Sequence, residues 1–255
     1  MTKYERLSQK LANREKVIGT TMQVLTSPII IEKMNVPDLD FLLFDGEHGV
    51  FGFENTLPLL HICRLVGLPS IVRVRDSQYQ LIAKLIDLGA DGIMLPRVES
   101  LEQIKTAIDA LKFYPIGTKG SGGYAQMRKG ESFDDFQKNG RIFFPQIESP
   151  KGIEMLGEML ETYGEYISAV IIGPYDMSVM VGTPNEVRSD IMNQQVQRIF
   201  DICQAHGKSC GIFCGNPDDA AYYRAMGANV LWTGADVMFY MQGFSETMRD
   251  LEQII

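Results

Sequence analysis

Polar side chains that could perform acid–base or metal chemistry end several short apolar runs of this sequence. The candidates are Asp45, Glu47 and His48 in FLLFDGEHG, Arg73 and Arg75 in IVRVRD, Gln146 and Glu148 in FFPQIES, and Asp176 in VIIGPYDMS. Glu148 and Asp176 form a carboxylate pair of the kind that binds a hard divalent cation such as Mg2+ or Mn2+. Without a cation, two close carboxylates repel and one tends to protonate. A carboxylate acid/base pair, as in glycosidases, is the alternative interpretation.

The neighbouring residues indicate how a substrate could be bound and deprotonated. His48 follows its apolar run, where it can act as a base near neutral pH; a solvent-facing loop histidine is the alternative. Arg73 is a charge within an apolar run and needs an anionic partner, which a substrate carboxylate or enolate oxygen would provide. We expect Arg75, two residues further on, to be a rim residue. Gly173 begins a tight turn after which backbone N–H groups can bind a carboxylate.

The order of the apolar runs indicates the fold that positions these residues. Helical stretches such as 55–66, 80–88, 101–113, 151–163, 193–206 and 217–226 alternate with continuous apolar runs typical of buried parallel strands. We expect strands at Val17–Gln23, Phe41–Asp45, Ser70–Arg75, Gly92–Arg97, Ile142–Ile147, Ala169–Gly173, Ser209–Cys214 and Asn229–Thr233. This pattern predicts an α/β protein, a (β/α)8 TIM barrel, as a single domain over residues 1–255. A doubly wound sheet is disfavoured because no GxGxxG follows the first strand.

One glycine-rich segment, Pro115–Phe136, is too long for a plain connection. We predict a mobile loop over the active site; a disordered tether is the alternative. In a TIM barrel the chemistry lies at the carboxyl ends of the strands, which is where the polar candidates above are expected.

Composition narrows the class of protein. The 255 residues carry a formal net charge of −8, which disfavours nucleic acid and anionic membranes as partners. No window of about 18 apolar residues predicts a membrane span, and the first residues do not resemble a secretory leader. The four cysteines form no CxxC pair, which favours reduced thiols in a cytoplasmic protein. The three histidines are too few for a polyhistidine site, so we expect a metal held mainly by oxygen.

Five motifs in order resemble the HpcH/HpaI aldolases, which are metal-dependent class II pyruvate aldolases. They are DGEHG at Asp45–Gly49, IVRVRD at Ile71–Asp76, LIDLGADGIMLPRV at Leu85–Val98, PQIES at Pro145–Ser149 and IIGPYDMS at Ile171–Ser178. The resemblance covers nearly the whole chain. It implies cleavage or formation of the carbon–carbon bond of 4-hydroxy-2-oxo acids, giving pyruvate or another 2-oxo acid and an aldehyde through a metal-stabilised enolate.

The resemblance also implies a role for each candidate residue. Glu148 and Asp176 would bind the metal, Mg2+ or Mn2+ with Co2+ as an alternative. Gln146, Gly173 and the backbone at Tyr175 and Asp176 would hold the 2-oxo acid. His48 would accept a proton through a water on the metal, Arg73 would stabilise transition-state charge, and Asp87 would raise the basicity of the histidine. Asp45 would also orient His48. Phe213, at the end of the seventh strand, is expected to border the aldehyde pocket.

Asp87 indicates an oligomer. It lies in the last turn of a predicted helix, where the helix dipole disfavours an anion, and that end should lie at the bottom of its own barrel. We therefore expect Asp87 to serve a neighbouring subunit. The resemblance implies a homohexamer built from dimers that exchange the last helix, 235–255, whose apolar start is consistent with an interface. Packing of that helix on its own barrel is the alternative.

Two departures from the family leave other functions open. Lys119-Gly120 replaces the usual Arg-Gly, and Tyr175 replaces a small residue. The runner-up functions are a citrate-synthase-like condensation that uses the same enolate chemistry, and a non-catalytic barrel that binds 2-oxo acids. No lysine occupies a Schiff-base position at a strand end, which argues against a class I aldolase.

Overall fold

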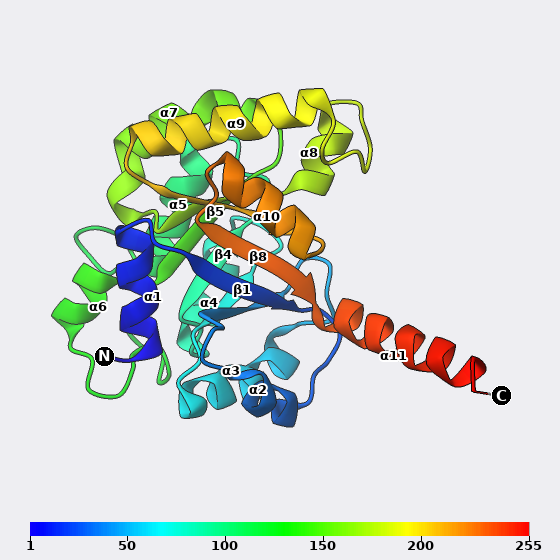
Figure 1. Cartoon of the computed structure of the whole chain (residues 1–255). Helices are drawn as coiled ribbons and strands as arrows, with labels where there is room; N and C mark the ends of the chain where they lie inside the picture. Colours follow the sequence, from blue (N-terminus) through cyan, green and yellow to red (C-terminus); the bar gives the residue numbers. More distant parts are fainter. Residues whose placement is uncertain (255) are drawn as a thin grey trace.

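Eight parallel strands close into a barrel in the order β1-β2-β3-β4-β5-β6-β7-β8 in a computed structural model that describes residues 1–254 (Figure 1). The (β/α)8 prediction is confirmed. The strands are β1 Val17–Met22, β2 Phe41–Asp45, β3 Ser70–Arg73, β4 Gly92–Leu95, β5 Ile142–Ile147, β6 Ala169–Ile172, β7 Ser209–Cys214 and β8 Val230–Ala235.

Helices surround the barrel, and most of them follow the expected segments. They are α1 Lys3–Ala12, α2 Pro28–Met34, α3 Phe53–Val66, α4 Tyr79–Asp87, α5 Leu101–Leu111, α6 Phe133–Asn139, α7 Pro150–Tyr163, α8 Pro174–Met180, α9 Asp190–Ala205, α10 Pro217–Met226 and α11 Asp236–Glu252, with a 3-10 turn at Gly164–Tyr166. The sequence-based interpretation did not include α1, α2, α6 or α8. Serine or asparagine side chains cap several helices, as Ser149 does for α7 by accepting from the Gly152 N–H.

Four of the predicted strands are too long at their carboxyl ends, β1 and β6 by one residue and β3 and β4 by two. β3 ends at Arg73 and β4 at Leu95, each two residues before the predicted end. Arg75 turns away to donate from Nε to the Gly46 carbonyl at 2.9 Å. Arg97 has a left-handed backbone with φ 50°, which no strand residue adopts.

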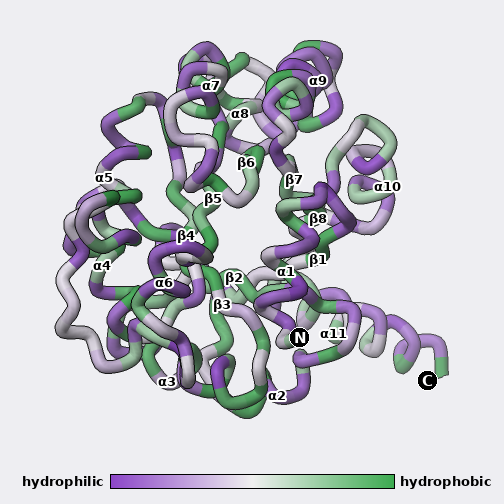
Figure 2. Tube along the Cα trace, turned by 90° about the vertical axis from the view of Figure 1, so that its left-hand side faces the viewer, coloured by the Kyte–Doolittle hydropathy of each residue, from purple (hydrophilic) through white to green (hydrophobic). Residues whose placement is uncertain are grey.

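Apolar side chains form one core inside the barrel and a second between the barrel and the helices. The inner core includes Phe41, Leu43 and Phe144, and Leu7 and Leu11 of α1 join it from the amino end. Figure 2 shows hydrophobic strands within a ring of helices, with α1 across the end that faces the viewer. Gly19 is required here because a Cβ at this position would lie 2.1 Å from Cζ of Phe41. The amino end is thus filled, and the open end is the carboxyl end.

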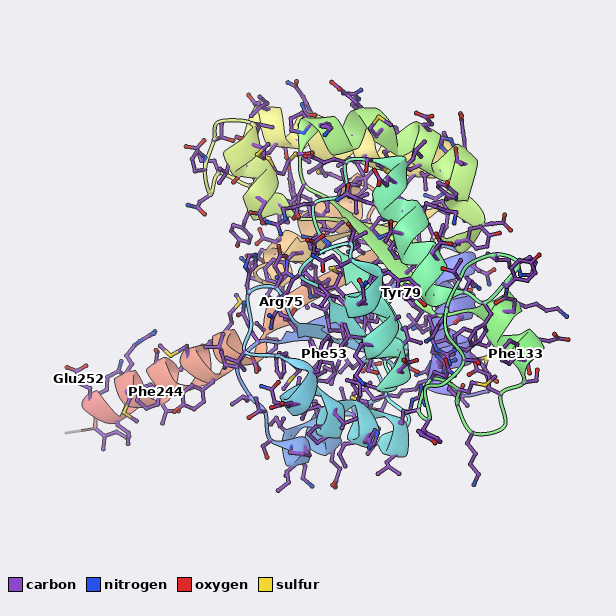
Figure 3. All side chains as sticks on the ribbon, turned by 180° about the vertical axis from the view of Figure 1, so that it is seen from behind. Phe53, Arg75, Tyr79, Phe133, Phe244 and Glu252 are labelled. Carbon is purple, nitrogen blue, oxygen red and sulfur yellow. The ribbon has the colours of Figure 1, made fainter. Side chains whose placement is uncertain are left out.

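The segment 115–136 lies at the amino end of the barrel, so the prediction of a loop over this chain's own site is wrong. It connects helix α5 to strand β5, and a helix-to-strand connection lies at the end where the strands begin. Polar contacts hold it there: Arg64 Nη1 donates to the Met127 carbonyl at 2.9 Å, and Lys119 Nζ donates to Asp87 at 2.5 Å. Figure 3 shows Phe133 at the side of the molecule opposite Arg75 and α11.

The last helix, α11, begins at the carboxyl end of β8 and projects away from the barrel (Figures 1 and 3). Its large apolar side chains are exposed, among them Phe239 at 50% and Phe244 at 49%. In residues 1–254 we find no helix with the length and apolar character to cross a membrane. The final residue of the predicted helix 235–255 lies outside the described residues.

Candidate active site

A cavity of about 330 Å3 opens at the carboxyl end of the barrel. Polar and aromatic residues from the ends of seven strands, all but β4, line it: Thr21, Gln23, Asp45, His48, Arg73, Gln146, Gly173, Pro174, Tyr175, Asp176, Phe213, Trp232, Ala235 and Met238. Apart from Glu148 and Asp87, every predicted site residue lines this cavity. Glu148 lies directly against it, because its Oε2 accepts from Gln146 Nε2 at 2.6 Å.

An ion pair between Asp45 and Arg73 forms one wall of the cavity. The two residues are neighbours in the β2–β3 register, and both guanidinium bonds reach the same carboxylate: Nε to Oδ1 at 3.0 Å and Nη2 to Oδ2 at 2.6 Å. Burial alone would raise the pKa of Asp45, but the hydrogen bonds and charge of Arg73 hold it below its ordinary value. The sequence analysis predicts a substrate anion as the partner of Arg73. In the structure, the partner of Arg73 is the carboxylate of Asp45. The Nη1 atom remains close to the cavity edge, 3.4 Å from Glu47.

Glu47 is a site residue to which the sequence analysis assigned no role. Its side chain is 9% exposed and lies 3.4 Å from Arg73 Nη1 and 3.1 Å from Arg97 Nη2. Its Oε2 atom is 3.8 Å from His48 Nε2. Its place between Asp45 and His48 in DGEHG was the available signal. Glu47 therefore connects the arginine to the histidine.

His48 lies at the rim of the cavity with its side chain 56% exposed. The turn that carries it is fixed by Asp45, whose Oδ1 accepts from the backbone N–H groups of Glu47 at 3.1 Å and of His48 at 3.0 Å. Asp45 thus positions the backbone of His48, while Glu47 is the carboxylate nearest to its ring. This arrangement leaves the imidazole accessible to water and to a bound molecule.

Glu148 and Asp176 lie at the ends of neighbouring strands. Glu148 follows β5, and the left-handed turn at Arg97 directs a backbone N–H to its Oε1 at 2.8 Å. Asp176 lies in the first turn of α8, where Pro174 is the first residue. Burial, together with the charges of Asp176 and Glu47, raises the pKa of Glu148 to about 7. The pair is therefore a concentration of negative charge that a cation would relieve.

Because Gly173 has no side chain, the side chains of Glu148 and Gln146 can lie directly against its backbone. A Cβ at Gly173 would lie 2.1 Å from Oε2 of Glu148 and 2.5 Å from Nε2 of Gln146. The Oε1 atom of Gln146 is buried and has no hydrogen-bond partner among the described residues. The backbone N–H groups of Tyr175 and Asp176 are in the first helical turn, where no intrahelical acceptor exists. Unpaired acceptor and donor groups thus surround the carboxylates.

This donor set fits a hard divalent cation. Within residues 1–254 no cluster of three or more His, Cys, Asp or Glu side chains is arranged as a metal cage. Two carboxylates with open surroundings are the arrangement that suits Mg2+ or Mn2+, because such ions keep several positions for water and substrate oxygens.

Aromatic side chains form another wall of the cavity. Phe213 contacts Trp232 edge to face, with ring centroids 4.9 Å apart, and Tyr175 lies 6.0 Å from Phe213. Trp232, the single tryptophan of the chain, was missed by the sequence analysis. Its position within the strand run GANVLWTG was the available signal. Its ring lies 5.7 Å from the Arg73 guanidinium, so the aromatic wall meets the Asp45–Arg73 pair at this residue.

Asp87 is remote from this chain's cavity. It is the last residue of α4, at the amino end of the barrel, and its Oδ1 accepts from Lys119 Nζ at 2.5 Å. The Lys119 side chain is 1% exposed, and its ammonium group compensates the charge of Asp87. Lys119 is the residue that replaces the arginine of the usual Arg-Gly pair. Within this chain the two residues do not contribute to the site.

Comparison with known proteins identifies the family. The family model described as HpcH/HpaI aldolase/citrate lyase matches residues 23–242. The chain belongs to this family. Among curated members, a 5-keto-4-deoxy-D-glucarate aldolase of Salmonella paratyphi C is 28% identical over 230 residues, covering 89% of each chain. A hydroxypyruvate/pyruvate aldolase of Delftia acidovorans is 27% identical over 220 residues, covering 85% of this chain and 81% of its own.

A solved HpcH/HpaI aldolase from Desulfitobacterium hafniense has the same fold, with a TM-score of 0.89, 23% identity and 96% coverage of both chains. Membership in the HpcH/HpaI family makes this chain an enzyme, a carbon–carbon lyase. The cavity at the carboxyl end of the barrel is where the fold places such chemistry.

Proposed function

We propose that this chain is a metal-dependent class II aldolase acting on 4-hydroxy-2-oxo acids. The products of cleavage are pyruvate, or another 2-oxo acid, and an aldehyde. One observation carries the proposal: Glu148, Asp176 and the buried Arg73 lie close together at the same cavity. A carboxylate pair for a cation and a fixed guanidinium for developing negative charge are the two requirements of enolate chemistry.

Glu148 and Asp176 would hold the cation, Mg2+ or Mn2+ with Co2+ as the alternative. A bound cation supplies Lewis-acid polarisation of the substrate ketone. The elevated pKa of Glu148, about 7, supports this assignment because the carboxylate lacks a cationic partner of its own. Gln146, through its unpaired Oε1 and its bond to Glu148, orients that carboxylate. The backbone N–H groups of Tyr175 and Asp176 would hold the substrate carboxylate beside Gly173.

Arg73 and His48 would carry the charge and the proton. Arg73 is held rigidly by two bonds to Asp45, so its remaining donor, Nη1, would need no reorganisation when negative charge develops on the substrate oxygen. His48 would accept the proton of the 4-hydroxyl group during cleavage, directly or through one water. Glu47, 3.8 Å from the ring, would stabilise the protonated imidazole.

Release of pyruvate from a panel of 4-hydroxy-2-oxo acids, with and without Mg2+ or Mn2+, tests the function. An aldolase releases pyruvate only when the cation is present. A condensing enzyme of the citrate-synthase type would need a thioester acceptor, and a barrel that only binds 2-oxo acids would do neither. Absence of release with every cation and acid tested would reject the aldolase.

We also propose a homo-oligomer, a hexamer built from dimers that exchange α11. The exposed side chains of Phe239, Met241 and Phe244 on a helix that projects from the barrel support an interface with a second copy. In such an assembly Asp87, compensated by Lys119 at the amino end, would reach the site of a neighbour and raise the basicity of its His48.

The proposed partners are small molecules, the 2-oxo acid and the aldehyde, and neither nucleic acid nor a membrane. We propose a cytoplasmic location. The four cysteines, all buried and free in the structure, support a reducing compartment.

A further inference from the structure

The cavity is divided by chemistry into two halves. Arg73, Gln146 and Asp176 belong to the half where the 2-oxo acid would bind. The other half is mainly aromatic or apolar, being formed by Tyr175, Phe213, Trp232, Ala235 and Met238, with the polar Thr21 and Gln23 of the β1 end beside it. The aldehyde product, whose carbonyl carbon is C4 of the substrate, must occupy the half that the 2-oxo acid does not use.

The aromatic half is a continuous and well-supported surface. Trp232 is 4% exposed, and its Nε1 donates to the Thr21 hydroxyl, so the indole edge is satisfied and the ring is fixed. Phe213 packs edge to face on it at 4.9 Å, and Tyr175, 42% exposed, extends the surface to the rim. A surface of fixed rings binds flat apolar groups at low entropic cost.

The charges of the cavity disfavour a second carboxylate on the substrate. Arg73 is the one lysine or arginine among the residues that line the cavity, and two nitrogens of its guanidinium are paired with Asp45. The acidic residues of the lining are Asp45 and Asp176, and Glu148 lies behind Gln146. Arg97, at the rim, is paired with Glu47. On the side of Tyr175, Asp219 lies close to the phenol and is itself paired with Arg188. Among the residues of this chain that the structure describes, an aldehyde carrying a carboxylate would find no unpaired lysine or arginine on this side.

We infer that the aldehyde partner is an uncharged aldehyde with an apolar, aromatic body, selected by Tyr175, Phe213 and Trp232. This inference rests on the proposed aldolase function and assigns its substrate class. In cleavage the C3–C4 bond breaks and its electron pair remains on the three-carbon fragment. The C4 hydroxyl gives its proton to the base and becomes the aldehyde carbonyl, and C3 then takes up one proton to give pyruvate. No oxidant or reductant is needed.

The first test measures the condensation of pyruvate with three aldehydes by the metal-loaded enzyme. Phenylacetaldehyde represents the inferred class, succinic semialdehyde carries a carboxylate, and glyceraldehyde carries hydroxyl groups. We expect kcat/KM for phenylacetaldehyde to exceed both of the others by about tenfold or more, as hydrophobic pockets discriminate. A kcat/KM for either polar aldehyde that equals or exceeds that for phenylacetaldehyde overturns the inference.

The second test assigns the selectivity to these side chains. Tyr175→Ala and Phe213→Leu change partly exposed residues, and circular dichroism will verify that both variants fold. We expect the ratio of kcat/KM for phenylacetaldehyde over glyceraldehyde to fall about fivefold, the size expected for lost aromatic contacts. Tyr124→Ala, a fully exposed tyrosine at the other end of the barrel, is the matched control and should keep the wild-type ratio. Unchanged ratios in both site variants would remove the aromatic wall as the selector.

A third measurement separates the inference from the function on which it rests. Exchange of the pyruvate methyl protons with D2O, followed by NMR on the wild-type enzyme with Mn2+ or Mg2+, reports proton transfer without any aldehyde. Exchange together with a preference for polar aldehydes would overturn the substrate class and leave the aldolase standing. Absence of exchange with both cations would overturn the function and the inference together.

Discussion

Asp45 and Arg73 face each other across adjacent strands and form a two-point ion pair that is almost fully buried. Their side chains are 1% and 8% exposed, and the same carboxylate also accepts from the backbone N–H groups that lead to His48. One aspartate thus fixes both the guanidinium and the turn that carries the histidine. The geometry of the proposed charge stabiliser and of the proposed base therefore depends on a single side chain.

The ion pair makes part of the folding stability depend on acid pH. The pKa of Asp45 is lowered in the folded state, so its stabilising contribution is present above the unfolded pKa of about 3.9 and is lost as the pH falls through the folded pKa. We expect Asp45→Asn to cost about 3 kcal/mol at pH 7, measured by urea unfolding, and less as the pH falls below about 4. Asp218→Asn, at an exposed position in α10, is the control. A cost that does not change between pH 7 and pH 3 would contradict this role of the carboxylate.

Arg73 itself is predicted to act on turnover and not on metal binding. Arg73→Ala should lower kcat by about 100-fold or more, as loss of one charge-stabilising donor does, while titration calorimetry still detects Mn2+ binding. Arg73→Lys should not restore activity, because lysine lacks the planar fork that meets Asp45 twice. Arg75→Ala, which removes an exposed arginine bonded to the Gly46 carbonyl, is the matched control. Wild-type kcat in Arg73→Ala would reject the assignment.

The two carboxylates Glu148 and Asp176 are predicted to be the cation ligands. Treatment with EDTA should abolish turnover, and added Mg2+ or Mn2+ should restore it. Glu148→Gln and Asp176→Asn should weaken Mn2+ binding by about 100-fold or more in calorimetric titrations, since each removes half of the anionic donors. Glu154→Gln, an exposed residue of α7, should bind Mn2+ like the wild type. Full activity of the EDTA-treated enzyme would disprove the metal-dependent mechanism.

Much of the barrel was predictable because buried parallel strands are apolar on both faces. The runs that became β2, β5 and β7 were predicted with their observed bounds. The ends of β3 and β4 were not, since Arg75 and Arg97 leave the sheet for contacts with distant residues that a local pattern does not contain. The error over 115–136 was avoidable, because a segment between a helix and the following strand lies at the amino end whatever its composition.

Within the site, residue types were predictable and partners were not. The register that sets Asp45 against Arg73 is a property of the closed sheet, so the sequence indicated only that Arg73 needed an anion. The aromatic wall was hidden for the same reason: Tyr175, Phe213 and Trp232 come from three separate strand ends and meet only in space. Asp87 was correctly expected at the bottom of its own barrel, but its bond to Lys119 was not foreseen.

The apolar side chains of α11 are predicted to hold the oligomer together. Phe244 is 49% exposed and stacks on Tyr240 with centroids 6.0 Å apart, on a helix that projects from the barrel. Phe244→Glu should shift the sedimentation profile toward smaller species at equal concentration, since it places a charge in an apolar interface. Leu65→Glu, at an 81% exposed position of α3, is the control. A wild-type protein that sediments as a monomer would exclude the interface.

The last prediction concerns Asp87, which can act only in a neighbouring site because it lies at the amino end of its own barrel. Asp87→Asn and Arg73→Ala should each be nearly inactive alone. Co-expressed, the two variants should regain about a quarter of wild-type activity, because a chain with an intact Arg73 can then pair with a neighbour that has an intact Asp87. Co-expression of Arg73→Ala with Glu148→Gln is the control and should give no recovery, since both residues lie in one cavity of one chain. If oligomers that contain both Asp87→Asn and Arg73→Ala chains regain no activity, Asp87 does not serve a neighbour.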